Sequence, residues 1–192
     1  TVTQNASGAF TGATITDKQG NKSSFDSKGR LTKIENNQEE SRYISIYYSG
    51  DTYKFSYICD GNQREYRFYY NSSTQLLSGI HYIGYEEVHY KTLNYTYDSN
   101  NNLTRITYGD GNKDTQFYYS SSHLMTRASQ ENDYLLYFNY TTSTAGLTNK
   151  VKKIEEEADL GNNTSSGGRI DFTYSHNETT IQDKSGHTNI YQ

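Results

Sequence analysis

The segment FDSKGRLTKI at residues 25–34 recurs as YDSNNNLTRI at residues 97–106. Both copies read aromatic-Asp-Ser-x-Gly/Asn-x-Leu-Thr-basic-Ile, and YNSSTQL at 70–76 is a degenerate third copy. Aromatic residues that open these and weaker copies lie near 25, 48, 70, 97, 118 and 140, a spacing that suits one β-hairpin per repeat. The sequence therefore predicts an all-β array of antiparallel hairpins.

Each position of the repeat has an expected physical role. The Asp opens a turn by accepting hydrogen bonds from the backbone two residues on, and Gly or Asn supplies a left-handed backbone conformation. The Leu and Ile, three residues apart, are expected on opposite faces of the outgoing strand, and the Thr after Leu is expected to favour a strand. The predicted repeat turn positions are Asp26, Gly29, Asp60, Gly61, Asp98, Asn101, Asp110, Gly111, Asp183 and Gly186.

Alternating aromatic and β-branched residues predict individual strands. YISIYY at 43–48 is one, and YKFSYIC at 53–59 is another, with Tyr53, Phe55, Tyr57 and Cys59 expected on one face. DGN at 60–62 joins the second to REYRFYY at 64–70 and predicts a type I′ hairpin turn, in which both central residues have positive φ.

The stretch from 150 to 168 leaves two alternatives open. A helix over 150–160 is conceivable, but a strand over 151–157 is preferred. The polar run LGNNTSSGG that ends at Gly168 is expected to be a loop, and a strand over 169–174 then pairs back.

The composition is unusual for a globular protein. The 192 residues include 21 Tyr and 15 Gly but no Pro and no Trp, and the formal net charge is −4. The modest charge and the 15% aromatic content argue against disorder, so Tyr must supply much of any core. A pI near 5.7 argues against nucleic-acid binding, and no apolar run approaches the length of a membrane helix.

Few side chains suggest chemistry. His81 and His89 flank Glu86 and Glu87, but their spacing is not that of a zinc protease, and exposed strand residues are the preferred interpretation. Cys59 is the single cysteine and is expected to be a buried structural thiol rather than a nucleophile. No catalytic residue, metal site or cofactor is predicted.

An aromatic stripe on residues 64–70 offers a binding alternative. Tyr66, Phe68 and Tyr70 could stack on sugar rings and make the chain a carbohydrate-binding or adhesion module. The apolar face of a sheet is the preferred interpretation of the same stripe, since little else is available to form it.

The repeat at 25–34 and 97–106 resembles the YD repeat, also called the Rhs repeat, over most of the chain. That resemblance implies secreted or surface-displayed bacterial proteins, with teneurins as relatives, whose repeats form a curved, partly rolled β-sheet shell that commonly encloses a toxin. It also implies a single repeat domain over 1–192, a fragment of a longer protein. The expected function is a non-catalytic structural one. The expected partners are the rest of the repeat chain, an enclosed toxin, and other chains that pair with open sheet edges.

The chain opens without a recognisable signal peptide, since TVTQNASGAFTG has neither a basic nor an apolar region. A bacterial secreted or cell-surface location therefore rests on the resemblance alone.

Overall fold

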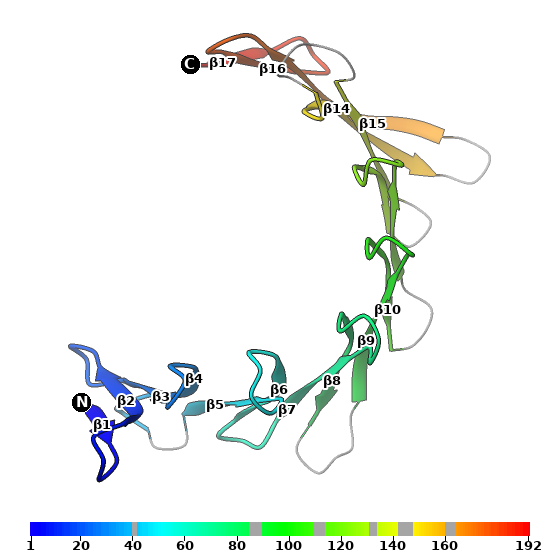
Figure 1. Cartoon of the computed structure of the whole chain (residues 1–192). Coiled ribbons are helices and arrows are strands. Elements are labelled where there is room, and N and C mark those ends of the chain that lie inside the picture. Colours follow the sequence, from blue (N-terminus) through cyan, green and yellow to red (C-terminus); the bar gives the residue numbers. More distant parts are fainter. Residues whose placement is uncertain (40–41, 85–89, 110–113, 131–133, 142–147, 160–163) are drawn as a thin grey trace. The chain divides into compact units, whose positions relative to one another are not determined.

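The structure is a computed structural model that describes residues 1–39, 42–84, 90–109, 114–130, 134–141, 148–159 and 164–192. These ranges form seventeen strands with turns between them and contain no helix (Figure 1). Every described strand pairing is antiparallel, which confirms the predicted all-β class. Within the described ranges, no helix is long and apolar enough to cross a membrane.

The chain divides into two compact units, Thr1–Asn94 and Tyr95–Gln192. The first unit contains β1 (Val2–Gln4), β2 (Phe10–Thr16), β3 (Lys22–Asp26), β4 (Leu31–Glu35), β5 (Tyr43–Tyr48), β6 (Phe55–Asp60), β7 (Glu65–Tyr70), β8 (Leu77–Ile83) and most of β9 (Tyr90–Tyr97). The second contains the end of β9, β10 (Leu103–Tyr108), β11 (Asp114–Tyr119), β12 (Met125–Gln130), β13 (Tyr134–Tyr140), β14 (Val151–Asp159), β15 (Thr164–Tyr174), β16 (Thr179–Asp183) and β17 (Thr188–Tyr191).

Within each unit, a strand pairs with the strands before and after it in the sequence. No second layer packs on these strands, so among the described residues no hydrophobic side chain is fully buried, and Ser45 is the most buried polar one at 9% exposed. Stability therefore comes from half-buried contacts between neighbouring strands rather than from a central core.

A β-bulge near the turn recurs in the hairpins. Phe25 pairs with Leu31 while Ser24 pairs with Lys33, so Thr32 is an extra residue. The same shift leaves one extra residue in other hairpins, namely Ser56, Ser78, Thr126 and Lys152. Because side chains alternate between faces with a period of two, each bulge shifts that alternation by one residue.

The bulges make two predictions from simple alternation wrong. Leu31 and Ile34 share a face, because Thr32 lies between them as an extra residue. Phe55 and Tyr57 lie on opposite faces. Their register partners, Tyr48 and Tyr47, are adjacent residues of β5, and adjacent residues of a strand face opposite ways.

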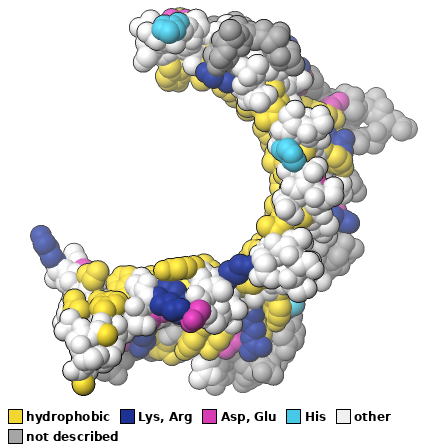
Figure 2. All heavy atoms as spheres, viewed as in Figure 1, with side chains coloured by type: hydrophobic (Ala, Val, Ile, Leu, Met, Phe, Trp, Pro, Cys, Tyr) yellow, Lys and Arg dark blue, Asp and Glu magenta, His cyan; other side chains and the backbone are white. Residues whose placement is uncertain are grey.

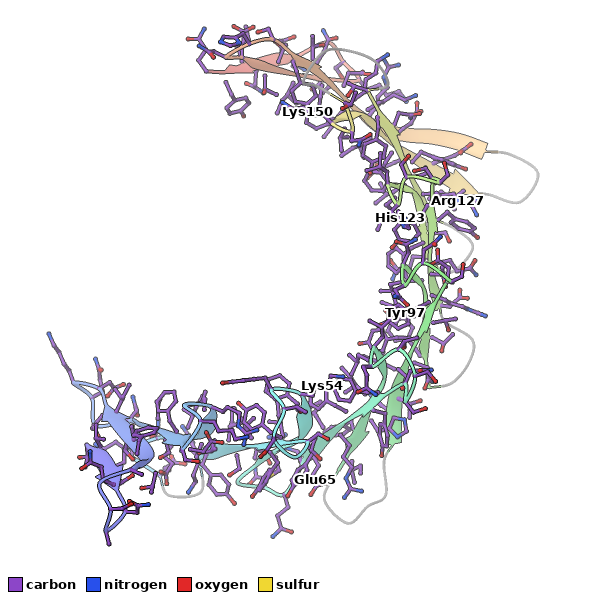
Figure 3. The ribbon with its side chains drawn as sticks, viewed as in Figure 1. Lys54, Glu65, Tyr97, His123, Arg127 and Lys150 are labelled. Carbon is purple, nitrogen blue, oxygen red and sulfur yellow. The ribbon has the colours of Figure 1, made fainter. Side chains whose placement is uncertain are left out.

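Each unit has two different faces. The apolar face of the first unit carries Leu31, Ile34, Ile44, Tyr48, Phe55, Ile58, Tyr66, Phe68, Tyr70, Leu77, Ile80 and Tyr82. The polar face carries Lys33, Glu35, Tyr43, Tyr47, Tyr57, Cys59, Glu65, Arg67, Tyr69 and His81. Lys54 and Glu65 lie on opposite sides of the first unit (Figure 3). Hydrophobic side chains gather on the side of Lys54 (Figure 2). In the second unit, the polar face carries Arg105, Gln116, Tyr118, Arg127, Tyr137, Glu155, Arg169 and Asp171, and the apolar face carries Ile106, Phe117, Tyr119, Ala128, Leu136, Phe138, Ile154 and Ile170.

The stretch after Lys150 forms strands. The preferred strand is confirmed as β14, and the helix alternative is wrong. The predicted loop is wrong for residues 164–168, which begin β15. There the Gly168 N–H donates to the carboxylate of Glu156 at 3.0 Å, and the close approach at Gly167 leaves no room for a side chain. Residues 160–163 lie outside the described part.

Candidate functional site

Aspartate side chains organise the turns. The Asp26 Oδ1 accepts the N–H groups of Lys28 at 2.9 Å and Arg30 at 3.0 Å, while its Oδ2 accepts the Arg30 Nε at 2.7 Å. Asp60 makes the same set of bonds with Asn62 and Arg64. These bonds satisfy turn N–H groups that would otherwise have no partner, so the carboxylates have a structural role.

The same arrangement recurs at other turns. Asp98 accepts from Asn100 and Asn102, each at 2.9 Å, and Asp183 accepts from Ser185 and His187 at the same distance. Asp110 and Gly111 lie outside the described residues.

The left-handed residue comes three positions after the residue that opens the turn. Gly29 (φ 75°), Asn101 (φ 65°) and Gly186 (φ 90°) hold this position. In the turn after Asp60 it is Gln63 (φ 61°), not Gly61, so the structure differs from the predicted type I′ turn. The Gly61 N–H instead donates to the carbonyl of Tyr43 at 3.1 Å. A Gln at this position is uncommon, because a side chain disfavours positive φ.

Hydrogen bonds hold the pKa values of the turn aspartates below their usual range. For Asp26, partial burial raises the pKa, but hydrogen bonds from the Arg30 backbone and guanidinium and from Lys28 outweigh it. For Asp98, the amide of Asn102 is the largest cause of the lowered pKa. These groups therefore stay ionised near neutral pH and are not poised as proton donors.

Tyrosine hydroxyls link successive hairpins. The Tyr48 hydroxyl donates to the Leu31 carbonyl at 2.8 Å, across the apolar face. The same link joins Tyr119 to Leu103 at 2.9 Å, Tyr140 to Met125 at 2.8 Å and Tyr174 to Val151 at 2.7 Å. Burial is the largest cause of the raised pKa of the Tyr48 and Tyr119 hydroxyls. The linking tyrosine of the weak copy is therefore Tyr119, one residue after the predicted position 118.

Basic side chains lie over several tyrosine rings near the turns. The Arg30 guanidinium lies 4.5 Å from the Tyr48 ring centroid, and the Lys54 ammonium lies 5.1 Å from that of Tyr70. Lys150 covers Tyr174 at 4.9 Å in the second unit. Cations over aromatic rings add electrostatic attraction to the packing, so these contacts join neighbouring hairpins at the turn edge.

Sequence reasoning missed a role for the repeat threonine. The Thr32 hydroxyl donates to the Ser24 carbonyl at 3.2 Å, and Thr104 and Thr126 make the same bond to Thr96 and Tyr118. Thr32 and Thr126 are the extra residues of their bulges. The sequence feature that could have indicated this role is the Leu-Thr or Met-Thr pair directly after the turn.

The polar face carries ion pairs within strands. Lys33 pairs with Glu35 at 2.8 Å, Arg67 with Glu65 at 2.8 Å, and Arg169 with Asp171 at 2.6 Å. Exposed pairs of this kind contribute little stability, but they mark this face as one that contacts water.

The residues proposed for ligand stacking lie together on the apolar face. Phe68 packs against Phe55 with ring centroids 5.5 Å apart, Tyr70 lies under Lys54, and Tyr66, 48% exposed, packs against Tyr82. Tyr66 is therefore the one of the three with the most accessible ring.

The other candidate side chains stay apart. His81 packs against Tyr69 on the polar face, while Glu86, Glu87 and His89 lie outside the described residues. Cys59 is partly exposed, and burial is the largest cause of its raised pKa. In the described ranges, no three His, Cys, Asp or Glu side chains are grouped to hold a metal ion.

An open hollow of about 660 Å³ lies on the apolar face of the first unit. Three isoleucines line it from different strands, Ile15 (61% exposed), Ile34 (40%) and Ile44 (43%). Ile34 and Ile44 are direct register partners. Charged side chains, among them Asp17, Arg42 and Arg64, also line it, so the hollow is mixed in character.

The fold has clear parallels among solved structures. The chain superposes on the TcdB2-TccC3-Cdc42 complex and on TcdB2-TccC3 without its hypervariable C-terminal region, each with a TM-score of 0.67 and 19% identity. The Tc holotoxin pore of Photorhabdus luminescens matches with a TM-score of 0.66 and 18% identity. The chain has the fold of a segment of these toxins.

Each of these matches covers 94% of this chain but only 10% of the toxin chain, so the chain spans about a tenth of the length of the structures it resembles. No protein-family model and no curated protein matches the sequence. At this identity the similarity shows the fold alone.

Proposed function

We propose that the chain is a non-catalytic wall segment of a larger YD/Rhs-repeat shell, which encloses or presents another polypeptide such as a toxin. The similarity of 94% of the chain to a tenth of the Tc toxin chains carries this proposal. The separation of the two faces supports it, because a wall between a polypeptide and water needs one apolar and one polar side.

The chemistry of the repeat also supports a structural role. The turn carboxylates are engaged by backbone N–H groups, and the tyrosine hydroxyls are engaged by carbonyls of the preceding hairpin. In this proposal the protein is secreted or displayed on a bacterial surface, as the resemblance implies. The apolar face contacts the enclosed polypeptide, and the isoleucine-lined hollow is part of that contact.

Photo-crosslinking from a matched pair of positions tests the proposal. Tyr66 and Tyr69 both lie on β7 and are 48% and 43% exposed, but they lie on opposite faces. A photo-crosslinking residue is placed at one position or the other in the full natural chain, and mass spectrometry identifies the crosslinked peptides.

We expect position 66 to crosslink to a polypeptide segment outside the neighbouring strands, and position 69 to give no such product. Equal crosslinking from both positions, or crosslinks from position 66 to adjacent strands alone, would contradict the proposal.

A further inference from the structure

A second hollow, of about 290 Å³, lies on the polar face of the second unit. It is lined by Thr96 from β9, Thr104 and Arg105 from β10, and Gln116, Phe117 and Tyr118 from β11. Its volume is close to the lower end of the range for small-molecule pockets. Its lining combines two aromatic residues, Phe117 and Tyr118, with a planar amide, a guanidinium and hydroxyl groups, and it includes no Val, Leu or Ile.

The Tyr118 ring is held in place before any ligand arrives. The Arg127 guanidinium lies 3.6 Å from its centroid, and the Tyr118 hydroxyl donates to the Gln116 Oε1 at 2.7 Å. Arg127 lies on β12, whereas the hollow is bounded by β9, β10 and β11. The ring is therefore covered from the β12 side and borders the hollow on the β10 side, with 39% of the residue exposed.

Arg127 lies on the side of the second unit opposite to His123 (Figure 3). Its Nε is buried and has no hydrogen-bond partner in the described structure, and its guanidinium packs on the Tyr118 ring. A ring fixed at both its face and its hydroxyl loses little freedom on binding, which favours affinity.

The polar groups around the hollow are also fixed. The Arg105 Nε donates to Asp114 at 2.6 Å, and the Gln116 amide donates to the same carboxylate at 3.0 Å. The Thr104 hydroxyl donates to the Thr96 carbonyl at 3.1 Å. A guanidinium has five N–H donors, more than one carboxylate oxygen can accept, so Arg105 can also donate to ligand hydroxyls.

We propose that this hollow binds one neutral pyranose ring. The apolar C–H face of the sugar stacks on Tyr118, and its hydroxyls accept from Arg105 and exchange hydrogen bonds with Gln116. The site is separate from the apolar face and does not depend on the shell function.

Ligand-observed NMR titration with methyl β-D-glucopyranoside, methyl β-D-galactopyranoside and methyl α-D-mannopyranoside tests the proposal. We expect saturable binding of at least one of them with a dissociation constant in the millimolar range, as suits a single small ring. Tyr118→Ala should weaken binding at least about tenfold, which corresponds to about 1.4 kcal/mol. Tyr118→Phe keeps the ring and should retain binding to within a few-fold.

Tyr66→Ala is the matched control, because it removes an exposed tyrosine from the apolar face of the first unit. It should leave the affinity unchanged. Circular dichroism establishes that each variant is folded, and should Tyr118→Ala fail to fold, Gln116→Leu provides the loss-of-binding variant. The proposal is overturned when none of the three glycosides binds saturably, or when binding survives loss of the Tyr118 ring or is lost in Tyr66→Ala.

Discussion

The left-handed turn position offers a reciprocal test of how the hairpins are stabilised. Gly29 and Gln63 hold the same position in two turns of the first unit, with φ of 75° and 61°. Gly29→Ala should destabilise the protein and Gln63→Gly should stabilise it. An added Cβ at Gly29 would meet nothing within 4 Å, so the effect there comes from the backbone alone.

The magnitude follows from two opposing contributions. A left-handed conformation costs a residue with a side chain roughly 1–2 kcal/mol. Glycine returns about 0.4–1 kcal/mol of this through its larger entropy in the unfolded chain. The net change should therefore be about 1 kcal/mol in each direction, which shifts the thermal midpoint of a chain of this size by roughly 2–4 °C.

Thermal and urea unfolding followed by circular dichroism measure both variants, with the double variant as the check on additivity. Because the two turns lie in different hairpins, the double variant should unfold close to the wild type. A stabilising Gly29→Ala, or a Gln63→Gly that lowers the midpoint, would refute the assignment of strain to this position.

Further predictions concern the other repeat positions. Tyr48→Phe should lower the free energy of unfolding by about 1 kcal/mol, the net contribution of one hydrogen bond. Tyr53→Phe is the control and should change the urea midpoint little, because the Tyr53 hydroxyl lies 3.4 Å from its carbonyl partner and the residue is 70% exposed. Thr32→Val should destabilise by a similar amount as Tyr48→Phe, and Thr32→Ser should recover most of the loss, since the serine hydroxyl can reach the same carbonyl. The pKa of Asp26 is lowered in the folded protein, so the contribution of its carboxylate to folding stability is present above the unfolded pKa and is lost as pH falls through the folded pKa. Asp26→Asn should therefore make the free energy of unfolding depend less on pH at acid pH. A pH dependence that is unchanged below about pH 4 would contradict this. Burial raises the pKa of Cys59, so iodoacetamide should alkylate it more slowly than free cysteine at pH 8, and equal rates would show that the thiol is not shielded.

The sequence predicted the hairpins better than it predicted the faces. The repeat at 25–34 contains a local turn signal, and Asp26 and Gly29 act within a few residues, so their geometry follows from the chemistry of short segments. The side on which Ile34 lies depends instead on the bulge at Thr32, which needs the pairing partner Ser24 to be known. Simple alternation therefore fails at each bulge.

The hollow beside Tyr118 could not be predicted for a related reason. It depends on side chains from three strands and on Arg127 from a fourth strand, β12, so no short segment of the sequence contains it. Nothing in the local pattern distinguishes Tyr118 from the neighbouring Tyr119, although one borders the polar hollow and the other donates to Leu103 across the apolar face.

The bulge has a consequence for how such a chain can evolve. A bulge next to the turn resets which side chains of a hairpin lie on each face. The faces of one hairpin therefore do not depend on the alternation in the hairpins before it. Duplication or loss of a whole hairpin therefore keeps every downstream residue on its correct side, whereas loss of a single residue such as Thr32 would disturb that hairpin alone. Length in this architecture can change by whole repeats, while errors stay within one of them.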